Sequence, residues 1–211
     1  MHEAGSLEEL REMLGDCARC PLHQSRTKLV FGYGDPGADL MFVGEAPGRA
    51  EDARGLPFVG PAGRLLDEML DSIGMERGQV YITNVVKCRP PGNRDPLPPE
   101  IEACNPFLTA QIRLVRPRII CELGRVAAGV MMGRPIPITR NHGRRFAGSG
   151  YSNVPVFHPA AALRAPATMQ LLRQDFQDLR GYLEEQQGPD GAPGEAEKPE
   201  EPGEPEQLGL F

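Results

Sequence analysis

Four cysteines of the chain combine residue type and spacing in a way that could hold a metal. Cys17 and Cys20 form a C-x2-C pair, and Cys88 and Cys104 follow with fifteen residues between them. Four cysteine thiolates suit either zinc or an iron–sulfur cluster. Zinc sites usually use two closely spaced pairs, so the wide second pair favours a cluster without deciding the matter. Four unrelated buried thiols are the alternative, which the polar loops around Cys17, Cys20 and Cys88 disfavour.

A second group of candidate residues lies where short apolar runs end. Gly44-Glu45-Ala46-Pro47-Gly48 follows one run, Asn84 closes a second, and His158 follows a third. Glycines at such a position let backbone N–H groups approach a ligand closely. Nearby, Gly55-Leu56-Pro57-Phe58-Val59-Gly60 presents one aromatic ring. Each feature alone is explained by a turn, a cap or core packing, but their combination with the cysteines predicts a ligand site.

The elements that must position these residues follow from the hydrophobic pattern. Short, largely apolar runs predict buried parallel strands at 40–43, 80–83, 118–123 and 154–157. Amphipathic stretches predict helices at 6–15, 62–73, 100–114, 124–132 and 168–184. This alternation predicts an α/β fold, a three-layer α/β/α sandwich around a short central parallel four-stranded sheet. Ligands of such sheets bind beyond the carboxyl ends of the strands, where the candidate residues lie.

Composition divides the chain into unlike parts. The 211 residues carry a net charge of −6, but residues 184–211 contain nine of the 29 acids and one of the 23 bases. The remainder has 20 acids and 22 bases, so it is slightly basic. We expect one domain over 1–184 and a disordered acidic Pro/Gly-rich linker over 185–206, because that composition cannot bury enough apolar surface to fold. No apolar run is long enough to cross a membrane, and no secretion signal is visible.

Taken together, these motifs resemble a known family. Cys17-x2-Cys20, GEAPGRAED at 44–52, GLPFVG at 55–60, ITNVVKCRPPGNR at 82–94, Cys104 and HPAA at 158–161 are similar to the iron–sulfur uracil-DNA glycosylases, family 4 of that superfamily. The resemblance runs from about residue 7 to 184. It implies a 4Fe–4S cluster rather than zinc, held by Cys17, Cys20, Cys88 and Cys104 in a structural role.

The resemblance also assigns roles around a uracil flipped out of DNA. Phe58 would stack on the ring, and the amide of Asn84 would read uracil O4 and N3–H together. His158 would stabilise the charge that develops on uracil O2, helped by backbone N–H groups of the loop containing Gly44, Glu45 and Ala46. The expected activity is monofunctional hydrolysis of the N-glycosidic bond in base excision repair, which leaves an abasic site.

Water activation is the part on which this chain departs from the best-known uracil glycosylases. Those enzymes have Gln-Asp-Pro-Tyr where this chain has Glu45-Ala46-Pro47-Gly48. Their catalytic Asp is therefore Ala46 here, a departure typical of family 4. Glu45 is the preferred substitute, and Glu51 and Asn93 are further candidates for positioning the water.

Two further expectations concern contacts with partners. The loop after His158 would enter the minor groove of DNA, with Leu163 as the wedge that fills the vacated stack. Residues 207–211 end the chain with Gln207-Leu208-Gly209-Leu210-Phe211, which resembles peptides that bind the bacterial sliding clamp. Gln207, Leu208, Leu210 and Phe211 would make that contact. We also expect the protein to be a monomer and to lie in the cytoplasm of a bacterium, associated with the nucleoid.

Two other classes of function compete with this interpretation. A non-catalytic iron–sulfur or zinc DNA-binding module, associated with a polymerase, would keep the four cysteines but would not need Phe58, Asn84 and His158 together. A nucleotide-binding protein could use 44–48 as a phosphate loop, but the Gly-Lys-Ser/Thr of a P-loop is missing there. Release of free uracil from DNA distinguishes all three.

Overall fold

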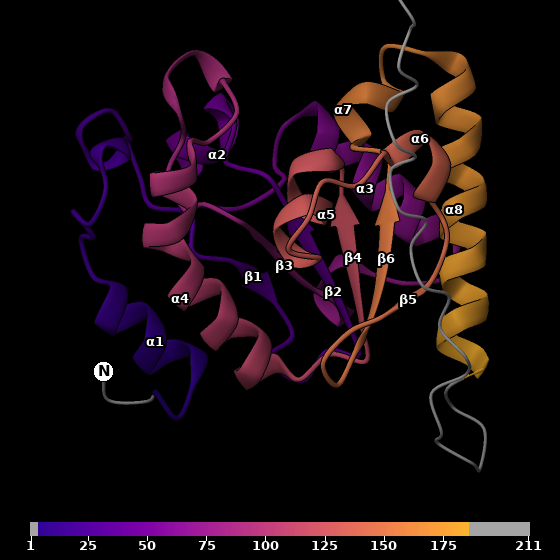
Figure 1. Cartoon of the computed structure of the whole chain (residues 1–211), viewed down its shortest axis with the longest axis horizontal. Coiled ribbons are helices and arrows are strands. Elements are labelled where there is room, and N and C mark those ends of the chain that lie inside the picture. Colours follow the sequence, from indigo (N-terminus) through magenta and orange to yellow (C-terminus); the bar gives the residue numbers. More distant parts are fainter. Residues whose placement is uncertain (1–3, 186–211) are drawn as a thin grey trace, which may run out of the picture.

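The computed structural model describes residues 4–185 of the 211-residue chain. The predicted linker at 185–206 and the predicted peptide at 207–211 lie outside these residues, apart from Glu185. A mixed sheet of six strands forms the centre of the molecule (Figure 1). Its strands, in chain order, are β1 (Tyr33–Gly34), β2 (Leu40–Gly44), β3 (Tyr81–Asn84), β4 (Ile119–Leu123), β5 (Phe146–Ala147) and β6 (Ser152–Val156).

Eight α-helices connect and cover these strands in the described part of the chain. They are α1 (Leu7–Leu14), α2 (Arg49–Arg54), α3 (Pro61–Ser72), α4 (Pro98–Val115), α5 (Arg125–Met131), α6 (Ile138–Asn141), α7 (Pro159–Ala162) and α8 (Pro166–Glu185). Short 3-10 turns are found at Pro21–Gln24, Arg77–Gln79 and Pro91–Asn93. No helix within 4–185 is both long and apolar enough to cross a bilayer.

The sheet is larger than the four strands that the sequence predicts. Its order is β1-β3-β2-β4-β6-β5, and the four predicted strands are the parallel centre, paired β3–β2, β2–β4 and β4–β6. The two additional strands, β1 and β5, pair antiparallel at the edges and have two residues each. Such short edge segments carry no hydrophobic periodicity, which is why the sequence does not reveal them.

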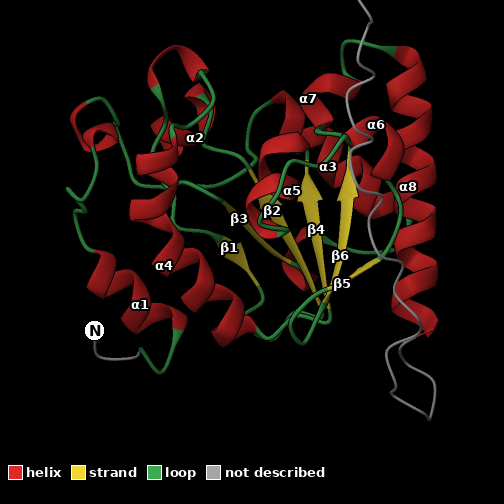
Figure 2. Cartoon of the chain, viewed as in Figure 1, coloured by secondary structure: helices red, strands yellow, loops and turns green. Residues whose placement is uncertain are grey.

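Both faces of the sheet are covered, so the predicted three-layer architecture is confirmed (Figure 2). On one face, α3, α7 and α8 pack on alternate residues of the parallel strands, among them Phe42, Ile82 and Cys121. On the other face, α4, α5 and the turn at Pro21–Gln24 pack on the intervening residues, among them Met41 and Ile120. Helix α1 packs outside α4 through Leu10 and Leu14. Burial on both faces explains why the central strands are continuous apolar runs.

Candidate active site

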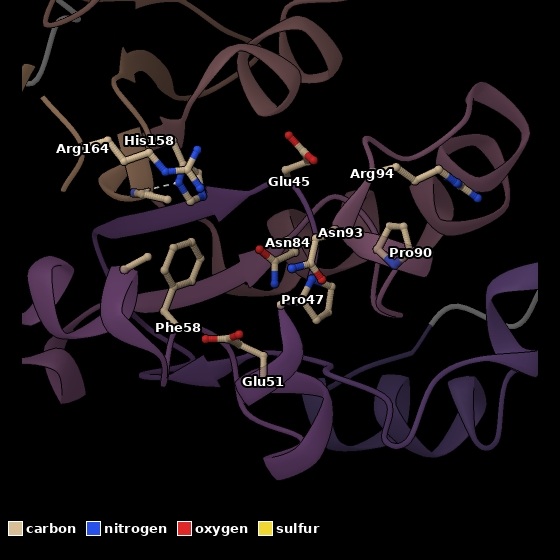
Figure 3. A pocket seen from close by; sticks show the side chains of 14 residues that line it. Glu45, Pro47, Glu51, Phe58, Asn84, Pro90, Asn93, Arg94, His158 and Arg164 are labelled. Carbon is tan, nitrogen blue, oxygen red and sulfur yellow. Dashed lines mark hydrogen bonds between the residues drawn. The ribbon is translucent and has the colours of Figure 1, made fainter. Parts of the chain in front are cut away.

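The four parallel strands end at one edge of the sheet, and the candidate residues meet there. A cavity of about 400 Å³ opens at this edge, a size typical of ligand pockets. Figure 3 shows Phe58, Asn84 and His158 around it, together with Glu45 and Glu51. Asn84 ends β3, Glu45 follows β2, and His158 precedes α7. Ala46 lines the same cavity, and Gly44, the last residue of β2, lies below the side chains of Asn84 and Phe58.

Gly44 is needed because two site side chains occupy the space above it. A Cβ atom at Gly44 would lie 2.4 Å from Asn84 Oδ1 and 2.7 Å from the ring of Phe58. Both distances are shorter than any real contact of a Cβ atom, so even alanine would push the amide or the ring aside. The glycine that ends β2 therefore allows the amide and the aromatic ring to meet at one point.

Asn84 carries a buried polar group without a protein partner. Its side chain is 1% exposed, and Oδ1 has no hydrogen-bond partner among the described residues. A buried oxygen left unpaired costs about 1–3 kcal/mol. An amide oriented into a cavity in this condition is suited to a ligand that supplies the missing hydrogen bond.

Phe58 is held in a strained conformation. Its φ is +50°, in the left-handed region that bulky residues rarely adopt. Glu51 fixes the loop, since its Oε1 accepts hydrogen bonds of 2.9 Å from the backbone N–H groups of Val59 and Gly60. Gly63 leaves room for the bend, because a Cβ atom there would lie 1.9 Å from the carbonyl oxygen of Phe58. The loop therefore presents the ring at a fixed place, 5.9 Å from the ring of His158.

His158 is a neutral hydrogen-bond donor in this setting. Its Nδ1 accepts a hydrogen bond of 3.1 Å from the backbone N–H of Ala160, so the ring proton is on Nε2. Burial lowers the pKa of His158 to about 4, against the opposing effect of Glu51. At neutral pH the imidazole is therefore uncharged and can donate through Nε2.

Glu45 has the titration expected of a base that works near neutral pH. Burial, and to a smaller extent the nearby Asp95, raises the pKa of Glu45 to about 7, against the opposing effect of Arg125. Asp95 and Arg125 form an ion pair of 2.7 Å. A carboxylate with such a pKa, in a cavity with ring-binding groups, can accept a proton from water.

The other candidates for positioning water have structural partners in this fold. One carboxylate oxygen of Glu51 is engaged by the Phe58 loop, as described above. Asn93, exposed and at φ +56°, accepts a hydrogen bond of 2.7 Å from Arg89. Both residues line the cavity, as Glu45 does. Leu163, the candidate wedge, follows α7 and is 49% exposed.

The four candidate ligand cysteines lie together beside α1 and α4. Cys104 is in α4, Cys88 is in the loop after β3, and Cys17 and Cys20 lie between α1 and the turn at Pro21–Gln24. All are free thiols, Cys88 and Cys104 are buried, and electrostatic interactions link Cys104 with each of the other three. Within 4–185, no three His, Cys, Asp or Glu side chains are arranged to hold a single metal ion.

Zinc and a four-iron cluster differ in how far apart they hold four thiolates. Zinc needs its sulfurs about 2.3 Å from a single point, whereas a cluster of four irons spreads its four thiolates further apart. Burial raises the pKa of the Cys88 thiol to about 11, so a bound positive group is needed to keep it ionised. Arg26 donates to Cys88 Sγ at 3.3 Å, and Arg19 donates to Cys17 Sγ at 3.2 Å.

Sequence reasoning missed these two arginines and the role of Glu51 in the Phe58 loop. Arg19 lies inside the C-x2-C pair and Arg26 follows it closely, so position next to the cysteines was the available signal. Nothing in the sequence indicates that Glu51 would bond to the backbone of residues 59 and 60. That contact depends on how α2 and the following loop fold together.

The fold and the site define an open α/β protein with an aromatic ring, a buried amide and a neutral imidazole around one cavity at the carboxyl edge of its sheet. The family model described as the uracil DNA glycosylase superfamily matches residues 31–180. Type-4 uracil-DNA glycosylases are similar over most of their length. The enzyme of Sulfurisphaera tokodaii is 47% identical, over 83% of this chain and 84% of its own length. The enzyme of Archaeoglobus fulgidus is 43% identical, over 82% of this chain and 92% of its own length. The enzyme of Thermotoga maritima is 41% identical, over 85% of this chain and 97% of its own length. The chain belongs to the type-4 uracil-DNA glycosylases.

Proposed function

We propose that this protein is a monofunctional uracil-DNA glycosylase, which flips uracil out of DNA, hydrolyses its N-glycosidic bond and leaves an abasic site for base excision repair. The observation that carries the proposal is the buried amide of Asn84, whose Oδ1 has no hydrogen-bond partner among the described residues, beside the ring of Phe58. Uracil supplies what this arrangement lacks, since its ring stacks on an aromatic face and its edge offers O4 and N3–H. Cytosine presents the opposite donor and acceptor pattern to a fixed amide.

Bond cleavage moves negative charge onto the departing base. As the bond between C1′ and uracil N1 breaks, its electron pair stays with uracil, and part of the charge develops on O2. The neutral Nε2–H of His158 donates to that oxygen, and backbone N–H groups of residues 44–48 add to the stabilisation. Water then bonds to the cationic C1′, and Glu45 takes its proton.

Release of free uracil tests this proposal directly. Excess protein is incubated with an oligonucleotide that contains one uracil, and free base and abasic sites are measured, with a thymine oligonucleotide as the control. No release of uracil would mean that the proposal is wrong and would favour a non-catalytic DNA-binding module. Borohydride should trap no covalent complex, because Lys28 and Lys87, the lysines of residues 4–185, do not line the cavity.

The pH dependence of the reaction should identify the base. If ionised Glu45 activates water, the single-turnover rate rises with pH up to the pKa of about 7 and then levels off. Glu45→Gln should lower the rate at pH 8 by about tenfold and abolish this rise; the loss is smaller than the roughly 10²–10⁴-fold typical of general base catalysis, because water bonds to C1′ only after the base has begun to leave. Asp95→Asn should move the inflection to lower pH, since Asp95 raises the pKa of Glu45. An unchanged inflection in Glu45→Gln would assign the rise to another group.

A 4Fe–4S cluster on Cys17, Cys20, Cys88 and Cys104 belongs to the same proposal. The group of free thiols, the two arginine donors and the family support it. These residues join α1, α4 and the loop after β3, so the cluster would brace the elements that carry the site. The visible spectrum and the iron content of the purified protein test this assignment independently of activity.

Contact with DNA completes the proposal for the domain. Leu163 would enter the space that uracil leaves, because an exposed leucine beside the cavity is available to stack in the duplex. The protein would act as a monomer in the bacterial cytoplasm, at the nucleoid.

The acidic C-terminal segment is proposed as a tether to the sliding clamp, although it lies outside the described residues. A flexible linker of roughly 22 residues reaches about 25 Å, which would keep the domain near clamp-bound DNA. Deleting Gln207–Phe211 should abolish binding to the clamp in a titration, and leave uracil release from short oligonucleotides unchanged. If the intact protein does not bind the clamp at concentrations of about tens of micromolar, the tether is wrong.

A further inference from the structure

Lys87 is buried in a way that lysine rarely is. Its side chain is 1% exposed, between the end of β3 and the cysteine group, and it directly precedes Cys88. Lysine is almost never fully buried unless its ammonium group is paired. The mechanism above gives this residue no role, although it touches both the uracil-reading strand and the ligand cysteines.

The contacts of Lys87 connect these two parts. Its Nζ donates to the backbone carbonyl of Asn84 at 2.6 Å and to Thr83 Oγ1 at 2.8 Å. Its backbone N–H donates to Cys104 Sγ at 3.4 Å. Its carbonyl accepts a hydrogen bond of 2.8 Å from Val30. One residue therefore joins the backbone of the pocket asparagine to the helix that carries a ligand cysteine.

Thr83 anchors the other end of this connection. Its hydroxyl donates to the carbonyl of Phe31 at 2.8 Å while it accepts from Lys87. Gln111, in α4 and 0% exposed, donates to the same carbonyl at 2.8 Å and to the hydroxyl of Tyr81 at 3.1 Å. A satisfied buried network of this kind fixes one arrangement of the backbone.

The position of the Asn84 amide depends on that arrangement. Asn84 is the last residue of β3, so its backbone beyond the strand is held by local contacts. The turn that follows is tied to the β2 loop by Val85 N–H to the Gly44 carbonyl at 2.8 Å and Val86 N–H to the Glu45 carbonyl at 3.2 Å. The carbonyl of Asn84 lies between strand β3 and these two hydrogen bonds, and it is held by the hydrogen bond from Lys87 Nζ.

We propose that Lys87 is a positioning residue that acts through Asn84. By holding the backbone carbonyl of Asn84, Lys87 keeps the side-chain amide where it can bond to uracil, and it links that position to the cysteine group. The inference rests on the proposed function. Lys87 touches no substrate atom, because it does not line the cavity and its Nζ bonds to two protein oxygens.

A double-mutant cycle tests whether Lys87 acts through Asn84. Lys87→Met keeps the apolar stem and removes the donors. In the otherwise wild-type chain it should lower the saturating single-turnover rate about tenfold and leave the enzyme concentration at half-saturation within about twofold. In an Asn84→Ala background, where no amide remains to be positioned, the same substitution should cost about twofold or less. A general structural role would lower both rates by the same factor.

Two measurements do not depend on turnover. Free uracil should raise the melting temperature of the wild type and raise that of Lys87→Met less, because the base is read less well. The visible absorbance of the cluster per chain should be the same in both proteins. Tyr81→Phe, which removes the outer hydroxyl of the network without touching Lys87, is the matched control and should keep the rate within about twofold.

The outcomes separate this inference from the proposed function. If the wild type releases no uracil, the function itself is wrong. Three results in an active wild type would show that Lys87 is not a positioning residue. Lys87→Met could be as fast as the wild type, could lose the same factor with and without Asn84→Ala, or could lose rate in proportion to a loss of visible absorbance. If Lys87→Met does not fold, Thr83→Val decides, since it removes one of the two acceptors; a loss of about threefold that vanishes in Asn84→Ala supports the inference, and no loss overturns it.

Discussion

His158→Ala should lower the single-turnover rate of uracil release about a hundredfold. Removing one donor to a developing oxyanion typically costs that much or more, because the donor is already oriented before charge appears. The hydrogen bond from Ala160 fixes Nε2–H as the donor, and the pKa of about 4 keeps the ring neutral. The measurement is a rapid-quench time course with excess enzyme on a uracil oligonucleotide.

A second substitution at His158 distinguishes hydrogen bonding from packing. The amide N–H of His158→Gln can reach the place of Nε2–H, so this variant should retain more activity than His158→Ala. Because His158 titrates only near pH 4, the inflection near pH 7 that we expect from Glu45 should remain in His158→Gln. Equal losses in the two variants would mean that His158 contributes shape rather than a donor.

The predictable part of the fold is the part that is buried on both faces. The strands β2, β3 and β4 match the predicted apolar runs to within one residue at each end, because every residue in them is buried. Strand β6 starts two residues earlier than the prediction of 154–157, at Ser152, because Ser152 and Asn153 are polar yet buried. Helix α2, with six residues, is too short to show a hydrophobic period.

The predicted site residues share a property that sequence can reveal. Asn84 and His158 stand directly after apolar runs, and topology brings the ends of parallel strands together. Phe58 lies between two glycines in a loop, and the structure explains its place by a positive φ and the contacts of Glu51. Lys87 was not predicted as part of the pocket's support, because the side-chain type argues for the surface and only the folded chain supplies its acceptors.

Asn84→Ala should reduce the single-turnover rate on uracil at least about thirtyfold. Two hydrogen bonds to the base edge are lost, each worth about 1 kcal/mol or somewhat more, and each 1.4 kcal/mol is a factor of ten in rate. Selectivity should fall as well, because the amide favours uracil over cytosine by its fixed donor and acceptor. Single-turnover rates on uracil and the release of cytosine from matched oligonucleotides measure both effects.

Asn141→Ala is the matched control for this prediction. Asn141 is 2% exposed and, like Asn84, has a side-chain oxygen without a partner among the described residues, but it lies in α6 and does not line the cavity. Asn141→Ala also removes the hydrogen bond of 2.9 Å that Nδ2 donates to the Pro137 carbonyl, so it should lower the melting temperature while the rate stays within about threefold of the wild type. If both alanine variants slow uracil release to the same extent, the effect is one of general stability, and Asn84 does not read the base. If only Asn84→Ala slows it, the unpaired buried oxygen in the cavity serves binding, while the one in α6 is only a cost to the fold.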